Sequence, residues 1–165
     1  MWPELVVWLA CLAAVWDLAW RSIPRWLTVA GGLLGLAHAI LAGSWLSSLS
    51  AAAAGLAFGV LLWQLDAVGG GDAKWLAALG ALLGFRGLCF AVCLALIIAG
   101  ITALVQLARQ HRLRDLGGRV AGIILGWRVY GLQPNPEIRL GAPDAVAAPF
   151  APALAIGIFC ALWLL

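Results

Sequence analysis

Two aspartates stand at the ends of apolar segments, where carboxylates could do chemistry. Asp17 ends the first apolar segment, and Asp72 follows three glycines, Gly69, Gly70 and Gly71, between the third and fourth segments. Two neighbouring carboxylates that share one proton can hydrolyse a peptide bond, because one deprotonates water while the other polarises the carbonyl and protonates the leaving amine. Glycines before Asp72 permit positive backbone dihedrals and close approach of an extended substrate strand. The pattern predicts a carboxylate dyad if the fold brings Asp17 to Asp72.

The composition indicates an integral membrane protein. Of 165 residues, 65% are hydrophobic and 10% are charged, whereas soluble domains are roughly 45–50% apolar. A soluble enzyme is therefore excluded. The length allows about six helices of roughly 20 residues. We expect one all-α, polytopic membrane domain over residues 1–165.

Six apolar segments predict about six transmembrane helices, the first of them retained and not cleaved as a signal peptide. They run over 3–20, 26–43, 49–68, 73–85, 87–108 and 149–165. The fourth segment is short and meets the third at the glycine run, so irregular backbone is expected where they line a cavity. In the remaining stretch, 109–148, we expect a cytoplasmic loop with an interfacial helix over 119–132, because Arg128 interrupts its apolar pattern.

The basic residues predict the orientation. Six alternating helices place all ten of them except Arg86 on one side, which should be the cytoplasm, with both termini outside. The net charge of +3 then marks the inner face and gives no reason to expect a nucleic-acid partner. In this topology Asp17 and Asp72 both fall at the cytoplasmic boundary of the membrane, within reach of cytosolic water.

Simpler roles compete for the charged residues. Asp72 could cap the fourth helix, and Asp17 could pair with Arg21, four residues later. Asp66 is a third acid at the same boundary, where a solvated helix end is the simpler interpretation and tuning of the dyad the alternative. Lys74 and Arg21 are expected to anchor the topology, and either could also steady an ionised aspartate.

Cysteines and histidines give no metal-binding pattern, so neither a metal nor a cofactor is expected. His38 and His111 have no ligand partner at useful spacing. The cysteines form no C-x-x-C pair and are expected to be buried small hydrophobes. They lie within apolar segments at Cys11, Cys89, Cys93 and Cys160.

Small residues predict where helices pack closely, since they let backbones approach one another in membranes. The candidates are Gly31, Gly32 and Gly35 in the second segment and 51–55 in the third. No ligand is needed to explain them.

The glycine run resembles a motif of membrane proteases. Gly69-Gly70-Gly71-Asp72, with Lys74 two residues later, is similar to the GxGD-x-K motif that begins the fourth helix of type IV prepilin peptidases, aspartic proteases of the GxGD class. The resemblance implies that Asp72 is catalytic. It also implies that the glycines and Lys74 support substrate binding.

Two further stretches extend the resemblance over most of the chain. Asp17, with Arg21 and Pro24 downstream, is similar to the first aspartate of the family and its Arg-x-Ile-Pro-Asn-x-Leu-Thr pattern. The segment 149–157 resembles the opening of the last helix. Arg25 stands where many members have asparagine. The resemblance implies that Asp17 is the second catalytic residue and that Arg21 and Pro24 support the site.

The resemblance implies a multi-pass aspartic endopeptidase of the bacterial inner membrane. It would cut the leader from a type IV prepilin at the cytoplasmic face, after a glycine just ahead of the hydrophobic helix. Larger members carry a cytosolic C-x-x-C pair and methylate the new N-terminus. This chain has neither the cysteine pair nor that loop, so we expect peptidase activity alone, as in the small enzymes for Flp-type pilins of tight-adherence systems. The expected partners are the prepilin and membrane lipid.

Two other functions remain open from the sequence. A small proton-coupled transporter would use intramembrane acids as relays, and those acids would sit near the middle of the bilayer. A catalytically silent member of the family could act as a subunit of a secretion complex. The sequence leaves open the oligomeric state and which pilin is cut.

Overall fold

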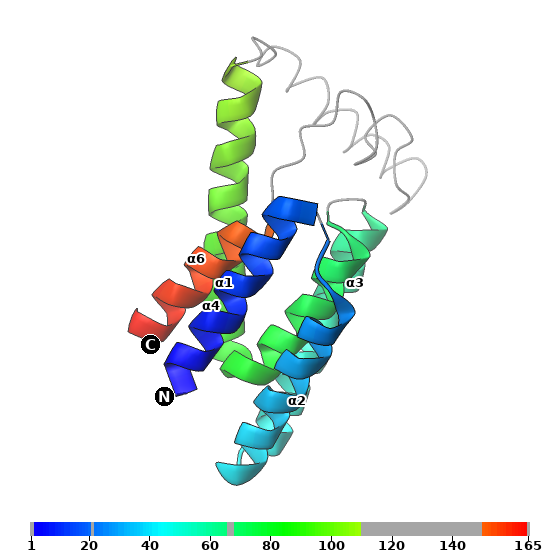
Figure 1. Cartoon of the computed structure of the whole chain (residues 1–165), viewed down its shortest axis with the longest axis vertical. Coiled ribbons are helices and arrows are strands. Elements are labelled where there is room, and N and C mark those ends of the chain that lie inside the picture. The colour runs from blue at the N-terminus through cyan, green and yellow to red at the C-terminus, as the bar shows by residue number, and fades with distance from the viewer. Residues whose placement is uncertain (1, 21, 66–67, 110–149, 165) are drawn as a thin grey trace.

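The computed structural model describes residues 2–20, 22–65, 68–109 and 150–164, and the elements in these ranges are all helices. The helices are α1 (Trp2–Trp20), α2 (Arg25–Leu41), α3 (Trp45–Gln64), α4 (Gly70–Arg109) and α6 (Phe150–Leu164) (Figure 1). The predicted all-α fold is confirmed for this part of the chain. The interfacial helix expected over 119–132, and the predictions for Arg21 and Asp66, lie outside the described residues.

Three of the helices are long and apolar enough to cross a membrane: α1, α3 and α4. The apolar helices α2 and α6 are shorter, at 17 and 15 residues, whereas a perpendicular crossing takes about 20. These properties are those of a membrane protein. The six crossings and the outside position of both termini stay predictions.

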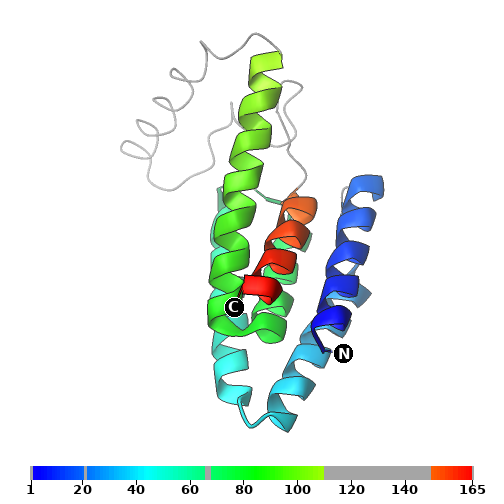
Figure 2. The same ribbon diagram turned by 90° about the vertical axis from the view of Figure 1, so that its left-hand side faces the viewer.

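The helix α4 consists of two parts that join at Gly84. The backbone there has φ 68° and ψ −178°, a conformation that is almost exclusive to glycine. The chain reverses at this point, so the first part of α4 runs beside α3 and the second part beside α6 (Figures 1 and 2). Two separate segments, 73–85 and 87–108, were expected here, and the observed break lies close to the expected one.

Successive helices run in opposite directions, and this brings the end of α1 close to the starts of α2 and α4. The ring of Trp2 stacks on that of His38 with centroids 3.8 Å apart, which joins the start of α1 to the end of α2. At the other end of these helices, the ring of Trp16 lies 4.7 Å from Trp20 and 6.1 Å from Trp26. The end of α1, the start of α2 and the start of α4 therefore share one end of the bundle.

Glycines allow α2 and α3 to approach the first part of α4 closely. A Cβ added to Gly59 would lie 2.6 Å from the Cα of Ala73, and one added to Gly35 of α2 would lie 2.6 Å from the carbonyl carbon of Ala81. The hydroxyl of Ser48 donates a hydrogen bond of 2.8 Å to the carbonyl of Ala81. The expected close packing is thus present at Gly35. It is absent at Gly32, where nothing lies within 4 Å of an added Cβ.

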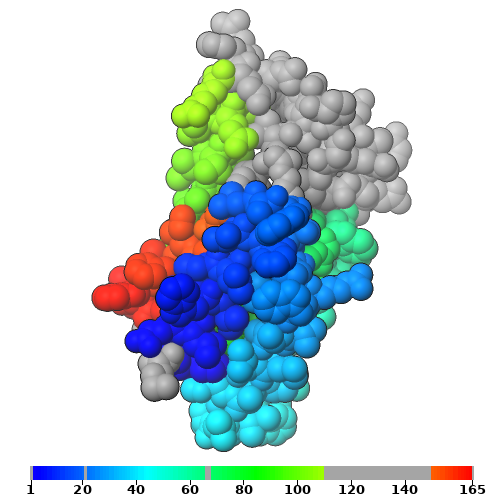
Figure 3. Space-filling view, viewed as in Figure 1, coloured from blue at the N-terminus to red at the C-terminus, as the bar shows by residue number. Residues whose placement is uncertain are grey.

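The core lies where α2 and α6 pack against α4, with α1 packed against α6. Its largest fully buried side chains are Trp75, Leu27, Leu76, Leu79, Leu154, Ile158 and Val6. In the space-filling view, α1 and α2 lie across the middle of the face, with α6 beside α1 (Figure 3). The expected burial of the cysteines is wrong: Cys11, Cys89 and Cys93 are exposed and Cys160 is half-buried. A thiol behaves as a small hydrophobe, so a lipid-facing position suits it as well as a core position does.

Candidate active site

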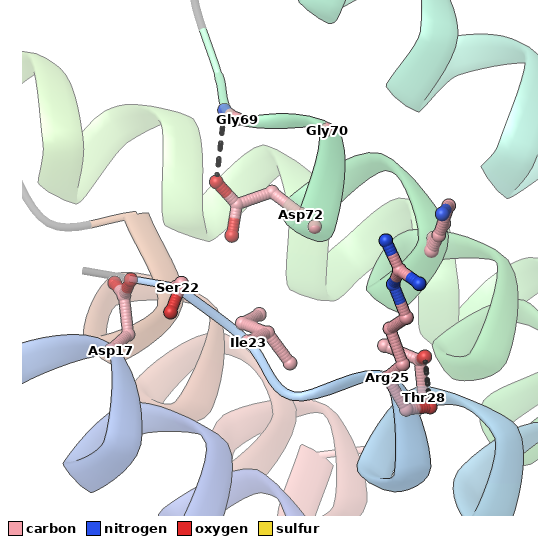
Figure 4. Close-up of a pocket in the computed structure, with 10 residues that line it drawn as sticks. Asp17, Ser22, Ile23, Arg25, Thr28, Gly69, Gly70 and Asp72 are labelled. Carbon is pink, nitrogen blue, oxygen red and sulfur yellow. Dashed lines mark hydrogen bonds between the residues drawn. The ribbon is translucent and has the colours of Figure 1, made fainter. Parts of the chain in front are cut away.

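Asp17 and Asp72 line the same cavity. Asp17 lies in the last turn of α1, and Asp72 is the third residue of α4. Both side chains border a cavity of about 390 Å³ between the ends of these helices and the start of α2, and their carboxylates point toward the same space (Figure 4). The antiparallel course of the helices thus brings together the two acids that the sequence singled out.

The other predicted site residues divide into three groups. Lys74 and the three glycines, Gly69 to Gly71, line the cavity with the aspartates. Pro24 does not line it; its carbonyl accepts hydrogen bonds from the N–H groups of Leu27 and Thr28, at 3.1 and 3.4 Å, and so begins α2. Arg21 is outside the described residues.

Asp72 is held by the backbone that precedes it. The N–H of Gly69 donates a hydrogen bond of 3.1 Å to Oδ2 of Asp72. In return, the carbonyl of Gly69 accepts from the N–H groups of Asp72 and Ala73, at 3.0 and 3.3 Å. The first of these bonds is one half of a capping box, in which the side chain of the third helical residue reaches back to the N–H of the cap. Gly69 has no side chain to supply the other half, and its carbonyl makes the first backbone bonds of the helix. The alternative in which Asp72 is the N-cap is therefore wrong, because Gly69 occupies the cap and Asp72 lies in the first turn.

The glycine run is used differently from the expectation. Among the described residues, positive φ occurs at Gly43 and Gly84 and not in the run before Asp72. The reason is that Gly70 and Gly71 already belong to the first turn of α4. A Cβ on Gly71 would stand 3.5 Å from the nitrogen of Ile23, an ordinary contact. The run keeps this wall of the cavity free of side chains, which leaves room for a peptide backbone.

Asp17 is a buried acid that acts on Asp72. Its side chain is 8% exposed, and a negative charge on Asp17 repels a negative charge on Asp72. Charges interact more strongly where water is excluded. Two carboxylates that repel each other in a common site can share a single proton, which is the arrangement that aspartic proteases use. The geometry is therefore suited to general acid and base catalysis on water.

Four further residues line the cavity and were not among the predicted site residues: Ser22, Ile23, Arg25 and Thr28. The hydroxyl of Thr28 donates a hydrogen bond of 2.8 Å to the carbonyl of Arg25 at the start of α2. Arg25 adds a second cation, besides Lys74, to the wall of the cavity (Figure 4). The available signal was their place in the stretch directly after Asp17, which has to leave α1 beside the site.

One protein family matches the sequence. The model of the type IV leader peptidase family matches residues 5–104, a range that includes Asp17, Asp72 and the whole described lining of the cavity. Neither a curated protein nor a solved structure gives a significant match.

Proposed function

Because the chain belongs to the type IV leader peptidase family, we propose that it removes the leader of a type IV prepilin with Asp17 and Asp72 as the catalytic pair. The observation that carries the proposal is the shared cavity: two carboxylates from distant parts of the sequence border one space. The glycine run beside them leaves room for the peptide to be cut. The family acts on protein substrates, and we propose that the substrate here is a prepilin and that the two aspartates activate the water.

The proposed reaction needs one proton on the pair. The ionised carboxylate takes a proton from a water molecule, while the protonated carboxyl donates a hydrogen bond to the carbonyl of the scissile peptide. Attack of the hydroxide gives a tetrahedral intermediate. The carbon–nitrogen bond then breaks, and the amine leaves with a proton from the pair. One water is consumed, and the pair ends with the single proton it had at the start.

The position of the site favours cleavage at the cytoplasmic face of the inner membrane. The cavity lies where α1 ends and where α2 and α4 begin, and Arg25 and Lys74 line it. Basic residues gather at the cytoplasmic ends of membrane helices. A proton relay would instead place its acids near mid-bilayer, so the location of Asp17 and Asp72 at helix ends favours the peptidase over the transporter. We propose six crossings with both termini outside.

We propose peptidase activity without methyl transfer, on the pattern of the cysteines within residues 1–165. The four cysteines form no C-x-x-C pair, the feature associated with the larger bifunctional enzymes. We therefore propose an Flp-type prepilin as the substrate.

The test is co-expression of the chain with an Flp-type prepilin in a host that lacks its own prepilin peptidase. Mass spectrometry of the membrane fraction should show the precursor shortened by its leader. A precursor whose glycine ahead of the hydrophobic helix is replaced serves as the control and should stay intact. An intact wild-type precursor beside a membrane-inserted enzyme would contradict the proposal and favour the silent subunit.

The hydrogen bond from Gly69 to Asp72 gives a second prediction. Gly69→Pro removes the N–H that holds Oδ2 of Asp72, whereas Gly69→Ala keeps it. A hydrogen bond to a charged group contributes about 1.5–3 kcal/mol, so Gly69→Pro should lower the cleavage rate by about tenfold or more. Gly69→Ala should lower the cleavage rate less, because it keeps the N–H and its Cβ would make only a close contact, 3.4 Å, with Oδ2. Equal rates in the two variants would show that this hydrogen bond does not position Asp72.

A further inference from the structure

A second hollow lies on the bundle beside the candidate active site. It has a volume of about 410 Å³ and is formed between α2, α3 and the first part of α4. We call it the apolar groove. Its lining is almost entirely aliphatic, with Leu33 and Leu36 on α2, Leu49 and Leu56 on α3, and Ala77 on α4.

The apolar groove adjoins the cavity that contains the aspartates. Thr28 and Lys74 line both hollows. From Thr28 to Leu36 the groove follows eight residues of α2, about 12 Å or two helical turns. A peptide chain that leaves the cavity past Thr28 and Lys74 would therefore meet the apolar groove, which follows α2 toward the opposite end of the bundle.

Gly32 lines the groove and faces open space. An added Cβ at Gly32 meets nothing within 4 Å, in contrast to Gly35 one turn later, where it would meet the backbone of Ala81. Gly32 was expected to support packing within the fold, and it faces the groove instead. The leucines at the rim stay exposed, with Leu33 63% and Leu56 43% accessible. In a membrane, small residues of this kind are the surface onto which another helix packs.

We propose that the apolar groove binds the first turns of the hydrophobic helix that follows the cleavage point in the precursor. The inference rests on the proposed function, since it concerns the substrate of the same site. With its scissile peptide at Asp17 and Asp72, the precursor has an apolar helix that begins within a residue or two of the cavity. The groove offers that helix an apolar surface at the required place. Lys74 stands at the junction, where the precursor passes from the polar cavity to the groove.

Photo-cross-linking tests the occupant without requiring catalysis. A benzoyl-phenylalanine replaces Leu33 in the groove or, as the matched control, Ile101 on the second part of α4; the two positions are 63% and 55% exposed. Both variants carry Asp72→Asn so that the precursor is not consumed. Cross-links to the precursor from position 33 and not from position 101 are expected. Cross-links from position 33 to lipid alone, or equal yields from both positions, would overturn the proposal.

A kinetic test uses two glycines with open surroundings. Gly32→Leu fills the groove, while Gly100→Leu adds the same side chain at a helical glycine of α4 where an added Cβ also meets nothing within 4 Å. Gly32→Leu should raise the KM for the precursor about tenfold, which corresponds to a loss of about 1.4 kcal/mol in binding. Gly100→Leu should leave the KM unchanged. An unchanged KM in Gly32→Leu would show that the precursor does not bind in the apolar groove.

The two tests separate this inference from the proposed function. If position 33 cross-links to the precursor while the wild-type chain cleaves nothing, the groove stands and the peptidase fails. If the wild-type chain cleaves the precursor while position 33 captures only lipid, the peptidase stands and the groove fails.

Discussion

Asp17→Asn and Asp72→Asn are each expected to lower prepilin cleavage by at least about 100-fold, because an amide can neither accept the proton of water nor return it. This value is at the low end of what general acid and base catalysis contributes. Both carboxylates border the same cavity, so neither should replace the other. Leader removal in the co-expression system, followed over time by mass spectrometry, measures the loss.

The matched control is Glu4→Gln, which also changes a carboxylate to an amide. Glu4 lies in the first turn of α1, thirteen residues before Asp17 on the same helix, or about 20 Å away. Its variant should cleave like the wild type. Asp66→Asn asks whether the third acid tunes the pair, and a solvated helix end predicts little change. Wild-type rates in either Asp17→Asn or Asp72→Asn would show that the dyad is not the catalytic unit.

Gly59→Ala should destabilise the protein and slow cleavage together. Its Cβ would lie 2.6 Å from the Cα of Ala73 and 2.9 Å from the carbonyl oxygen of the same residue. These are backbone atoms, so α3 and α4 have to move apart, and overpacking of this kind costs about 1–3 kcal/mol. Ala73 follows Asp72 directly, and a displacement of about 1 Å at a reacting group can cost about 100-fold in rate. The thermal midpoint in detergent and the cleavage rate measure the two effects.

Gly100→Ala is the control for this prediction. It makes the same substitution within α4 at a site where nothing lies within 4 Å of the added Cβ. Since alanine is the better helix former, the midpoint should stay the same or rise, and cleavage should not change. A Gly59→Ala variant that behaves like Gly100→Ala would mean that α3 and α4 are less closely packed at Ala73 than the structure shows.

The sequence by itself was enough to predict a helical membrane protein and to single out Asp17 and Asp72 as candidate site residues. Apolar segments set the approximate bounds of each described helix, because hydrophobicity and helix-ending residues are local properties. The alternation of helix directions then put Asp17 and Asp72 at the same end. The motifs around Asp17 and Asp72 indicated the family that the comparison supports over residues 5–104.

Only the tertiary structure decided how the helices face one another. That Arg25 lines the cavity, that Gly69 and not Asp72 takes the cap position, and that Gly32 faces a groove while Gly35 meets Ala81 all depend on helix rotation. In a chain that is 65% hydrophobic, the apolar pattern does not distinguish a lipid-facing side from a buried one. The rotation is set by contacts between residues far apart in the sequence, such as Gly59 with Ala73, and no local pattern records those contacts.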